Sequence, residues 1–366
     1  MSGEPSTNAS SARREISELL QNAVEWIHSI LASFPMHCYK FVSMNVCSAE
    51  LSQASSAFHF EKNETIPLFG TDGVFETPTK DFFLKLDADA LDRLHDATRP
   101  KFLQTYSRNV LNAGGEKEHE KELRVLRELI GPLCGGKCLV STHGKPPSTT
   151  RQYTGVFEPA NLGIGNYNTW HGFLDAVAKP GGSLSEVILS LSLSDRNEEE
   201  SSAEPSSDNE ESSAGKATRQ LSHSSDGDGC PLEFKLKVSE KGLSQAAAEA
   251  IVYSFVHHNR HPSQSSLVPN LLLDDKSFYI VMYDCVADVL LISDEVMIVS
   301  DQTHMNHILL LWMILHHKVI LKTTEHYKNL KSFCSGFREE CTRCKWLSHY
   351  ESLQDYDQIS IPKKQP

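Results

Sequence analysis

Asp175, Glu233 and Lys235 are residues whose types and spacing suit chemistry on a phosphate ester. Glu233 and Lys235 stand two positions apart in LEFKLKV, a segment at 232–238 whose alternating apolar and polar residues predict a β-strand. Side chains two positions apart point to the same face of a strand, so the carboxylate and the ammonium project together. Asp175, in a second predicted strand at 173–178, can meet them from a neighbouring position.

Two such carboxylates can hold Mg²⁺ or Mn²⁺ through their oxygens, with waters and a substrate phosphate completing the coordination shell. Lys235 can orient the attacking water or stabilise charge that develops on the phosphoryl oxygens. An acid on the predicted helix 117–130, either Glu118 or Glu122, can join the metal site. Gln245 begins the helix expected to flank the site, and Tyr253, eight residues on, lies on roughly the same helical face.

At these residues the chain resembles the PD-(D/E)xK nuclease superfamily. The core of that superfamily is an α-β-β-β-α-β arrangement, with an acid on one strand and (D/E)xK on the next. The motifs in this chain are most similar to those of the exonuclease-like branch of the superfamily. In that branch, a strand with Gly-x-x-Asp and an upstream His is followed by the acid-x-Lys strand and then by a helix that carries Gln-x-x-x-Tyr. The corresponding residues here are His171-Gly172-Phe173-Leu174-Asp175, Glu233-Phe234-Lys235 and Gln245, and the resemblance covers about residues 115–300.

The resemblance implies a metal-dependent nuclease acting on DNA or RNA phosphodiesters. Asp175 and Glu233 would bind Mg²⁺ or Mn²⁺, with His171 as an extra ligand and Glu122 as the helix acid. Lys235 would be catalytic and Gln245 would contact the substrate. The catalytic set is therefore expected to be Asp175, Glu233, Lys235 and Gln245.

The chain differs from the family pattern in three places. Leu174 stands where a proline usually precedes the first acid, and Glu249 stands where a tyrosine is expected four residues after Gln245. Between Asp175 and Glu233 lie 57 residues, far more than a hairpin needs. The alternative interpretation is a non-catalytic interaction protein that retains a nuclease-like fold, with Glu233 and Lys235 on a solvated strand face.

Around these residues the order of predicted elements indicates an α/β protein whose central mixed sheet is flanked by helices. The resemblance implies that this sheet is a restriction-endonuclease-like core, with N-terminal and C-terminal helical elaborations. The predicted helices are 15–31, 86–111 with a break or kink at Pro100, 117–130 ended by Gly131-Pro132, 243–257 and 305–321. The predicted strands are 173–178, 186–193, 232–238, 277–283 and 289–293, with 295–299 as an extension. The expected organisation is a disordered tail at 1–14, an N-terminal helical or mixed module at 15–110, the α/β domain at 111–325 and a C-terminal extension at 326–366.

The formal net charge of −13 on 366 residues is unevenly distributed. Segment 195–229 holds ten acids and three bases with almost no apolar residues, so a disordered acidic insertion is expected there. The rest of the chain carries only about −6, so the total charge does not exclude a nucleic-acid partner. The insertion suits the recruitment of protein partners.

The N-terminus lacks the apolar core of a secretory signal, and the longest apolar run, 308–315, is shorter than the roughly 20 residues that cross a bilayer. We therefore expect no membrane association, a buried helix at 308–315 and an intracellular location, nuclear or cytoplasmic. Nine cysteines are then expected to be reduced thiols. Cys334, Cys341, Cys344 and His349 are types that bind Zn²⁺, but a second closely spaced pair is missing and no zinc is expected.

Overall fold

The computed structural model describes residues 34–44, 49–79, 100–112, 117–134, 137–141, 157–179, 229–300, 304–320, 323 and 333–353. The predicted tail 1–14, helix 15–31 and strand 186–193 lie outside the described residues. So do residues 86–99 of the predicted helix 86–111 and the acidic segment 195–229 apart from Gly229.

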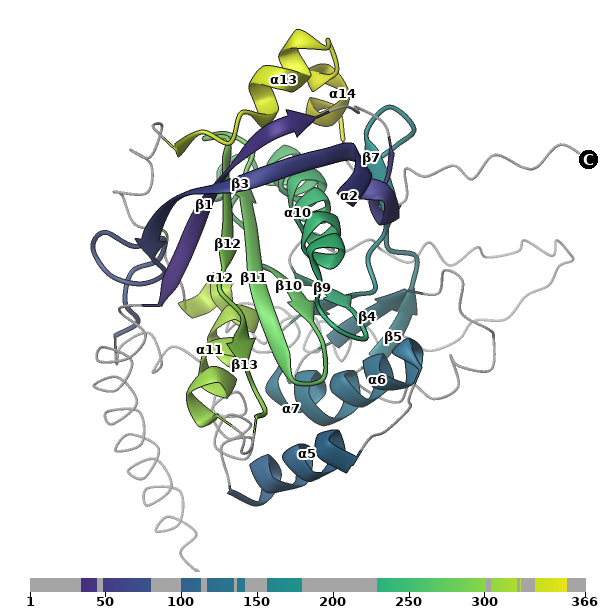
Figure 1. Ribbon diagram of the computed structural model, residues 1–366, viewed down its shortest axis with the longest axis vertical. Coiled ribbons are helices and arrows are strands. Elements are labelled where there is room, and N and C mark those ends of the chain that lie inside the picture. Colours follow the sequence, from purple (N-terminus) through teal and green to yellow (C-terminus); the bar gives the residue numbers. More distant parts are fainter. Residues whose placement is uncertain are drawn as a thin grey trace, which may run out of the picture.

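A large mixed sheet forms the centre of the molecule, and helices cover both of its faces (Figure 1). Nine strands lie in the spatial order β3-β1-β12-β11-β10-β9-β8-β4-β5, and β13 pairs with β11 beside this row. Their bounds are Pro35–Met44 (β1), Phe58–Pro67 (β3), Lys137–Ser141 (β4), Phe157–Ala160 (β5), Ala176–Lys179 (β8), Cys230–Phe234 (β9), Asn270–Leu273 (β10), Ser277–Asp284 (β11), Val289–Ser293 (β12) and Val296–Met297 (β13). The β9–β10 and β4–β5 pairs are parallel, and the other pairs in the row are antiparallel.

A second, small sheet stands beside the large one and consists of β2 (Ala49–Glu50), β7 (Trp170–Phe173) and β6 (Gly163–Ile164) in that order. Two short helical segments follow β2, namely η2 (Leu51–Gln53) and α2 (Ala54–Ala57). Leu51 and Ala54 pack with residues of α10 in one apolar cluster, so the small sheet is tied to the same core.

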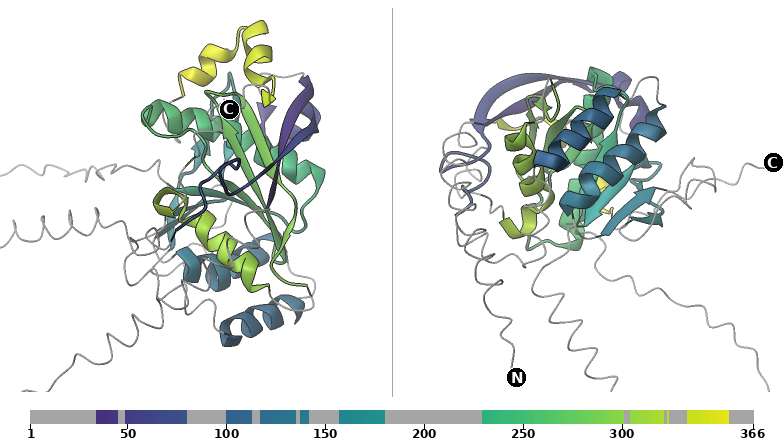
Figure 2. Two further views of the ribbon diagram at one scale, coloured as in Figure 1. Left: turned by 90° about the vertical axis from the view of Figure 1, so that its left-hand side faces the viewer. Right: turned by 90° about the horizontal axis from the view of Figure 1, so that it is seen from below.

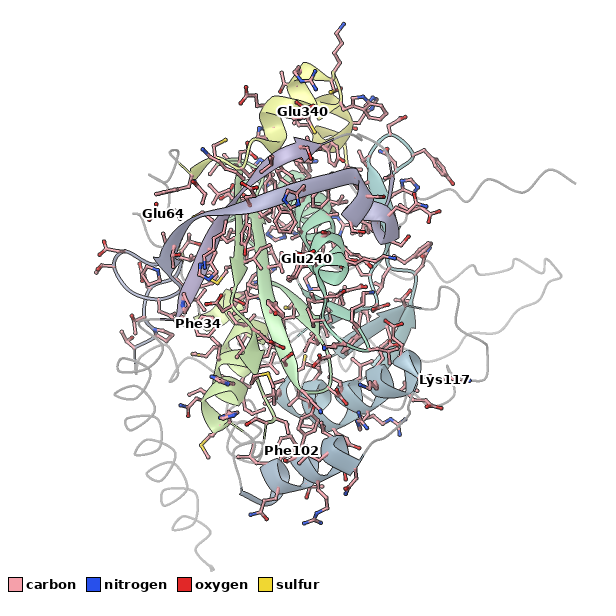
Figure 3. The ribbon with its side chains drawn as sticks, viewed as in Figure 1. Phe34, Glu64, Phe102, Lys117, Glu240 and Glu340 are labelled. Carbon is pink, nitrogen blue, oxygen red and sulfur yellow. The ribbon has the colours of Figure 1, made fainter. Side chains whose placement is uncertain are left out.

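The helices divide between the two faces of the large sheet (Figures 1 and 2). Their bounds are Pro100–Asn112 (α5), Glu118–Val125 (α6), Leu126–Ile130 (the π-helical turn η3), Gly131–Cys134 (α7), Glu240–Arg260 (α10), Met305–Leu315 (α11), His317–Ile320 (α12), Phe337–Arg343 (α13) and Leu347–Glu351 (α14). Because strand side chains alternate between faces, Ile280 of β11 packs with α7 and α11 whereas Val281 packs with α10. The side chains fill both layers (Figure 3).

The structure confirms several predicted elements. The helix at 243–257 is the centre of α10, the strands at 277–283 and 289–293 are β11 and β12, and the turn between them lies at 285–288. The apolar run 308–315 is buried throughout within α11. Among the described helices, none combines the length and the apolar character needed to cross a membrane.

The prediction of one continuous strand over residues 173–178 was wrong. The chain leaves the small sheet after Phe173 and enters the large sheet at Ala176, so Leu174 and Asp175 lie between two short strands. The strand predicted at 232–238 begins two residues earlier, as β9, and ends at Phe234. Lys235 therefore lies just beyond the strand, although its backbone N–H still donates to the Leu273 carbonyl at 2.9 Å.

Gly131-Pro132 does not end the helix predicted at 117–130. The chain continues through η3 into α7, which ends at Cys134. Proline is tolerated in the first turn of a helix because its missing N–H is not needed there. The wide turn η3 allows α7 to begin at Gly131, with Pro132 in that first turn. The helix predicted at 305–321 is likewise two segments, α11 and α12.

Segments expected to lie outside the α/β domain contribute to its core. β1 and β3, from the expected module 15–110, extend the large sheet through the β1–β12 pairing. From the expected C-terminal extension, Phe337 and Tyr350 pack against α10, and the Tyr350 ring lies 5.5 Å from that of Phe255. The described parts of the three regions therefore share one core.

Candidate active site

Asp175 lies where β7 gives way to β8, directly beside the end of β9. β8 and β9 are antiparallel with Ala176 opposite Leu232, so the residue before β8 adjoins the last residues of β9. The Asp175 carboxylate accepts the backbone N–H of Phe234 at 2.9 Å through Oδ2. This bond holds the first predicted acid against the acid-x-Lys segment.

Glu233 is the centre of the polar cluster. It points to the α10 side of the sheet and is only 3% exposed. Its Oε1 accepts hydrogen bonds from the Lys235 ammonium and from Gln245 Nε2, the latter at 2.7 Å. Glu233, Lys235 and Gln245 therefore meet at the end of β9.

Glu249 is a carboxylate that the sequence interpretation registered only as a departure from the family pattern. It lies on α10 one turn after Gln245, and its Oε1 accepts a second hydrogen bond from Gln245 Nε2 at 2.9 Å. Glu249 is 2% exposed and stands in a run of alanines, Ala246 to Ala248 and Ala250. A glutamate in the buried Ala-rich stripe of a helix is the sequence signal that could have identified it, because buried charges are rare unless they are paired.

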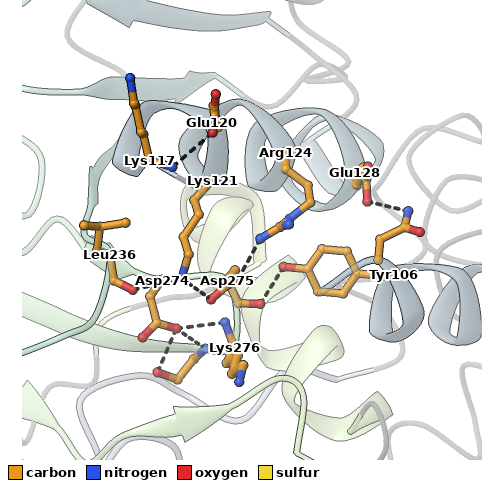
Figure 4. Close-up of polar contacts among 12 residues, drawn as sticks. Tyr106, Lys117, Glu120, Lys121, Arg124, Glu128, Leu236, Asp274, Asp275 and Lys276 are labelled. Carbon is orange, nitrogen blue, oxygen red and sulfur yellow. Dashed lines mark hydrogen bonds and ion pairs between the residues drawn. The ribbon is translucent and has the colours of Figure 1, made fainter. Parts of the chain in front are cut away.

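The segment that carries Lys235 is held to α6 (Figure 4). Lys121 Nζ donates to the Leu236 carbonyl at 3.1 Å, and to Asp275 Oδ1 at 3.3 Å. Arg124 donates to Asp275 Oδ2 at 2.7 Å. The carbonyl of Asp275 accepts the Tyr106 hydroxyl at 3.0 Å, which adds α5 to the network. The turn between β10 and β11 thus anchors both helices beside Lys235.

Burial and mutual repulsion dominate the electrostatics of the cluster. Burial raises the pKa of Glu233 well above its ordinary value, and the charges of Asp175 and Glu249 raise it further, while Lys235 lowers it. Burial also raises the pKa of Glu249 to about 7, against the lowering effect of the hydrogen bond from Gln245. For Lys235, burial lowers the pKa, but the attraction of Glu233 outweighs burial and the net direction is upward. Lys235 therefore keeps its charge.

Glu233, Asp175 and Glu249 act electrostatically on this one ammonium, and the more exposed Glu118 pairs with it. If all of these carboxyl groups are ionised, a single positive charge does not compensate them. Such a cluster must either take up protons or bind a cation, because unpaired buried charge is costly. Glu233 Oε2 is also buried and accepts no N–H or hydroxyl donor from the described residues, while the carboxyl groups of Glu233 and Glu249 lie within hydrogen-bonding reach of each other once one of them is protonated.

On α6, Glu118 Oε1 lies 4.0 Å from Lys235 Nζ. Glu122, the acid expected as a metal ligand, is buried on α6 at 5% exposure. His171 lies in the small sheet, where its Nδ1 is 3.0 Å from the Thr169 carbonyl and its ring packs against Tyr167. Tyr253 donates its hydroxyl to the Gly229 carbonyl at 3.0 Å and so supports the start of β9.

The cysteines near the C-terminus have other polar contacts. The Cys334 thiol donates to Asp288 at 2.9 Å, and the Cys344 thiol lies 3.6 Å from Glu340 Oε1. Over the described ranges, no group of three or more His, Cys, Asp or Glu side chains has a geometry that could hold a metal ion. This finding applies both to these cysteines and to the four expected ligands Asp175, Glu233, His171 and Glu122.

Comparison with known proteins identifies no relative: no family model, no curated protein and no solved structure matches the chain.

Proposed function

We propose that this protein is a metal-dependent nuclease of the PD-(D/E)xK type that acts on DNA or RNA phosphodiesters. The observation that carries the proposal is the cluster at the end of β9. Asp175 bonds to the backbone of Phe234, and Glu233 binds both Lys235 and Gln245. Residues of the expected types, distant in the sequence, thus meet in the order that the resemblance requires.

The topology around the cluster supports the same proposal. In chain order, α6, β4, β8, β9, α10 and β10 follow an α-β-β-β-α-β sequence, with β5, β6 and β7 inserted after β4. β8 is antiparallel to both of its neighbours, and β9 is parallel to β10 across the α10 crossover. In open α/β sheets, ligands bind beyond the carboxyl ends of the strands, and the cluster stands at that end of β9.

The donor set fits a divalent cation of the Mg²⁺ or Mn²⁺ class. These ions take oxygen ligands, and Mg²⁺ in particular binds through one or two carboxylates with several waters. Glu233 Oε2 accepts no N–H or hydroxyl donor among the described residues and can serve as a ligand, and a divalent ion would compensate the excess of carboxyl groups over the single ammonium of Lys235. Asp175 and Glu233 would hold the ion, which would supply Lewis-acid activation of water and neutralise charge on the phosphate.

The remaining residues have distinct contributions. Lys235 keeps a positive charge and its side chain is 25% exposed, so its ammonium can reach a phosphoryl oxygen while it remains beside Glu233. Gln245 holds Glu233 Oε1 and prevents the carboxylate from rotating away. Preorganised donors of this kind stabilise charge that develops in a transition state.

The second candidate is an interaction protein that keeps this fold without catalysis. One observation favours it: Oε1 of Glu233 accepts both the Lys235 ammonium and the Gln245 amide, so this carboxylate has partners without any ion. In this case the acidic insertion would recruit protein partners.

Incubation of the full chain with labelled single-stranded and double-stranded DNA and RNA, with and without Mn²⁺ or Mg²⁺, tests the proposal. We expect cleavage that requires the cation and is lost in Lys235→Ala and Glu233→Gln. The matched control is Lys241→Ala, an exposed lysine in the first turn of α10. The absence of cation-dependent cleavage of every substrate by the wild type would overturn the nuclease proposal and favour the interaction protein.

A further inference from the structure

The side-chain amide of Gln245 bridges two buried carboxylates. Its Nε2 donates to Glu233 Oε1 at 2.7 Å and to Glu249 Oε1 at 2.9 Å. A glutamine NH₂ group has two N–H donors, so this pair of bonds uses both of them. The amide therefore connects a glutamate of β9 with a glutamate of its own helix.

The amide orientation in the structure directs both of its N–H groups at the two glutamates. When these carboxylates are ionised, a flipped amide would direct its carbonyl oxygen at two oxygens that can accept but not donate. The Gln245 Oε1 atom must then face away from both glutamates. Gln245 is half-buried, and its Oε1 neither bonds to any described residue nor belongs to the buried unpaired atoms, so it borders solvent.

We propose that Glu249 is a positioning residue that fixes the Gln245 amide with both N–H groups toward the carboxylates. Gln245 then keeps a donor on Glu233 and presents its Oε1 outward as an acceptor for an O–H donor such as the attacking water. The inference rests on the proposed function, since it assigns a role within the same site. It adds Glu249, which occupies the position of the family's tyrosine.

The position of Glu249 on α10 explains how it can act. Residues four apart lie one above the other on a helix, so Glu249 approaches Gln245 from the following turn. Glu249 is 2% exposed in a helix whose neighbouring residues are alanines, and a buried carboxylate without a partner is destabilising. Its bond with Gln245 provides that partner and also restricts the rotation of the glutamine.

The experiment measures Mn²⁺ affinity and cleavage rate for the full chain carrying Glu249→Ala, Glu249→Gln, Gln245→Ala or the double substitution Gln245→Ala/Glu249→Ala. Loss of a residue that orients a metal ligand typically costs 10-fold to 100-fold in metal affinity or activity, so Glu249→Ala should lose at least about 10-fold. Glu249→Gln should recover most of this loss, because a glutamine oxygen can still accept the Gln245 N–H. The double variant should be no worse than Gln245→Ala, because the effects of residues that act through one another do not add.

Two results would overturn the inference. An equal loss in Glu249→Gln and Glu249→Ala would mean that Glu249 acts through its charge. If the fold-loss of the double variant equals the product of the fold-losses of the two single alanine variants, Glu249 acts independently of Gln245. Ser254→Ala is the control for a lost buried hydrogen bond on the same helix, since Ser254 donates to the Ser266 carbonyl at 3.0 Å.

A readout that needs no activity separates this inference from the proposed function. In protein labelled with ¹⁵N-glutamine, the side-chain amide resonances of Gln245 are assigned by their loss in Gln245→Ala. Both amide protons should be shifted from free glutamine values in the wild type and in Glu249→Gln, and one should return toward those values in Glu249→Ala. If the wild type cleaves no substrate but shows this pattern of shifts, the nuclease proposal is refuted and the positioning role of Glu249 is retained. If the wild-type Gln245 resonances are not shifted, the positioning role itself is refuted.

Discussion

The carboxylate of Asp175 accepts the backbone N–H of Phe234 at 2.9 Å, although 59 positions separate the two residues in the sequence. The bond joins the junction between the two sheets to the last residue of β9. The bond uses Oδ2 of the Asp175 carboxylate.

Asp175→Asn and Asp175→Ala should have different effects on stability. The asparagine oxygen can still accept the Phe234 N–H, whereas alanine leaves that donor without its partner. We expect Asp175→Ala to lose about 1–3 kcal/mol of unfolding free energy and Asp175→Asn to lose less. Urea unfolding measures both, and equal losses would show that the hydrogen bond is not what stabilises this junction.

A divalent cation should raise the melting temperature of the wild type. An ion that binds only the folded state at about 100 times its dissociation constant adds about 2.7 kcal/mol, which corresponds to several degrees in Tm. Glu233→Gln should remove this response while leaving the metal-free protein folded, because it removes a buried charge. A thermal melt with and without Mn²⁺ checks this, and an unchanged response in Glu233→Gln would exclude Glu233 as a ligand.

Without a cation, the unfolding free energy should fall as pH rises through the neutral range. The pKa of Glu249 is about 7 in the folded protein, above its ordinary 4.5, so the folded state binds more protons than the unfolded state between these values. Stability is then greatest at the acidic end and declines up to and beyond pH 7. Glu249→Gln should reduce this slope in urea titrations, with Glu233 contributing the remainder, whereas the exposed Glu240→Gln on the same helix should leave it unchanged.

His317 should produce a dependence of the opposite sign in acid. The pKa of His317 is lowered to about 3, first by burial and then by the charge of Lys318, while its hydrogen bond to the Ile314 carbonyl opposes this. Below the ordinary value of 6.5 the unfolded state binds the extra proton, so stability falls as pH decreases from 6.5 toward 3. His317→Asn should reduce this loss, and His59→Asn, whose side chain is 66% exposed, serves as the control.

Asp275 should be among the residues most important for stability. Its side chain is 4% exposed and pairs with Arg124, which is 8% exposed. Removal of one partner from a buried pair typically costs about 3–5 kcal/mol, so we expect Asp275→Ala to lose an amount in this range. The apolar double substitution Arg124→Met/Asp275→Leu should recover part of it. A loss in Asp275→Ala no larger than that in Asp294→Ala, whose side chain is 61% exposed, would contradict this.

Elements with a long or regular apolar pattern could be predicted from the sequence. α10, β11 and β12 lie within a few residues of their predicted bounds and α11 begins at its predicted residue, because their apolar pattern alone indicates the buried face. Short elements were less predictable. β10 has four residues, all buried, and such a brief apolar run has no period; β1 and β3 become strands through pairing with each other and with β12.

The sequence by itself determined the α/β class, the types of residue available for phosphate chemistry and the proximity of Glu233 to Lys235. Only the tertiary structure decided which distant groups join them. The β8–β9 register places Asp175 at Phe234, and the packing of α10 buries Glu249 beside Gln245. The local pattern of apolar and polar residues indicates which face of an element is buried. Which carboxylates come together in the buried space depends on long-range strand pairing and helix packing. The raised pKa values of Glu233 and Glu249 depend on the same long-range contacts.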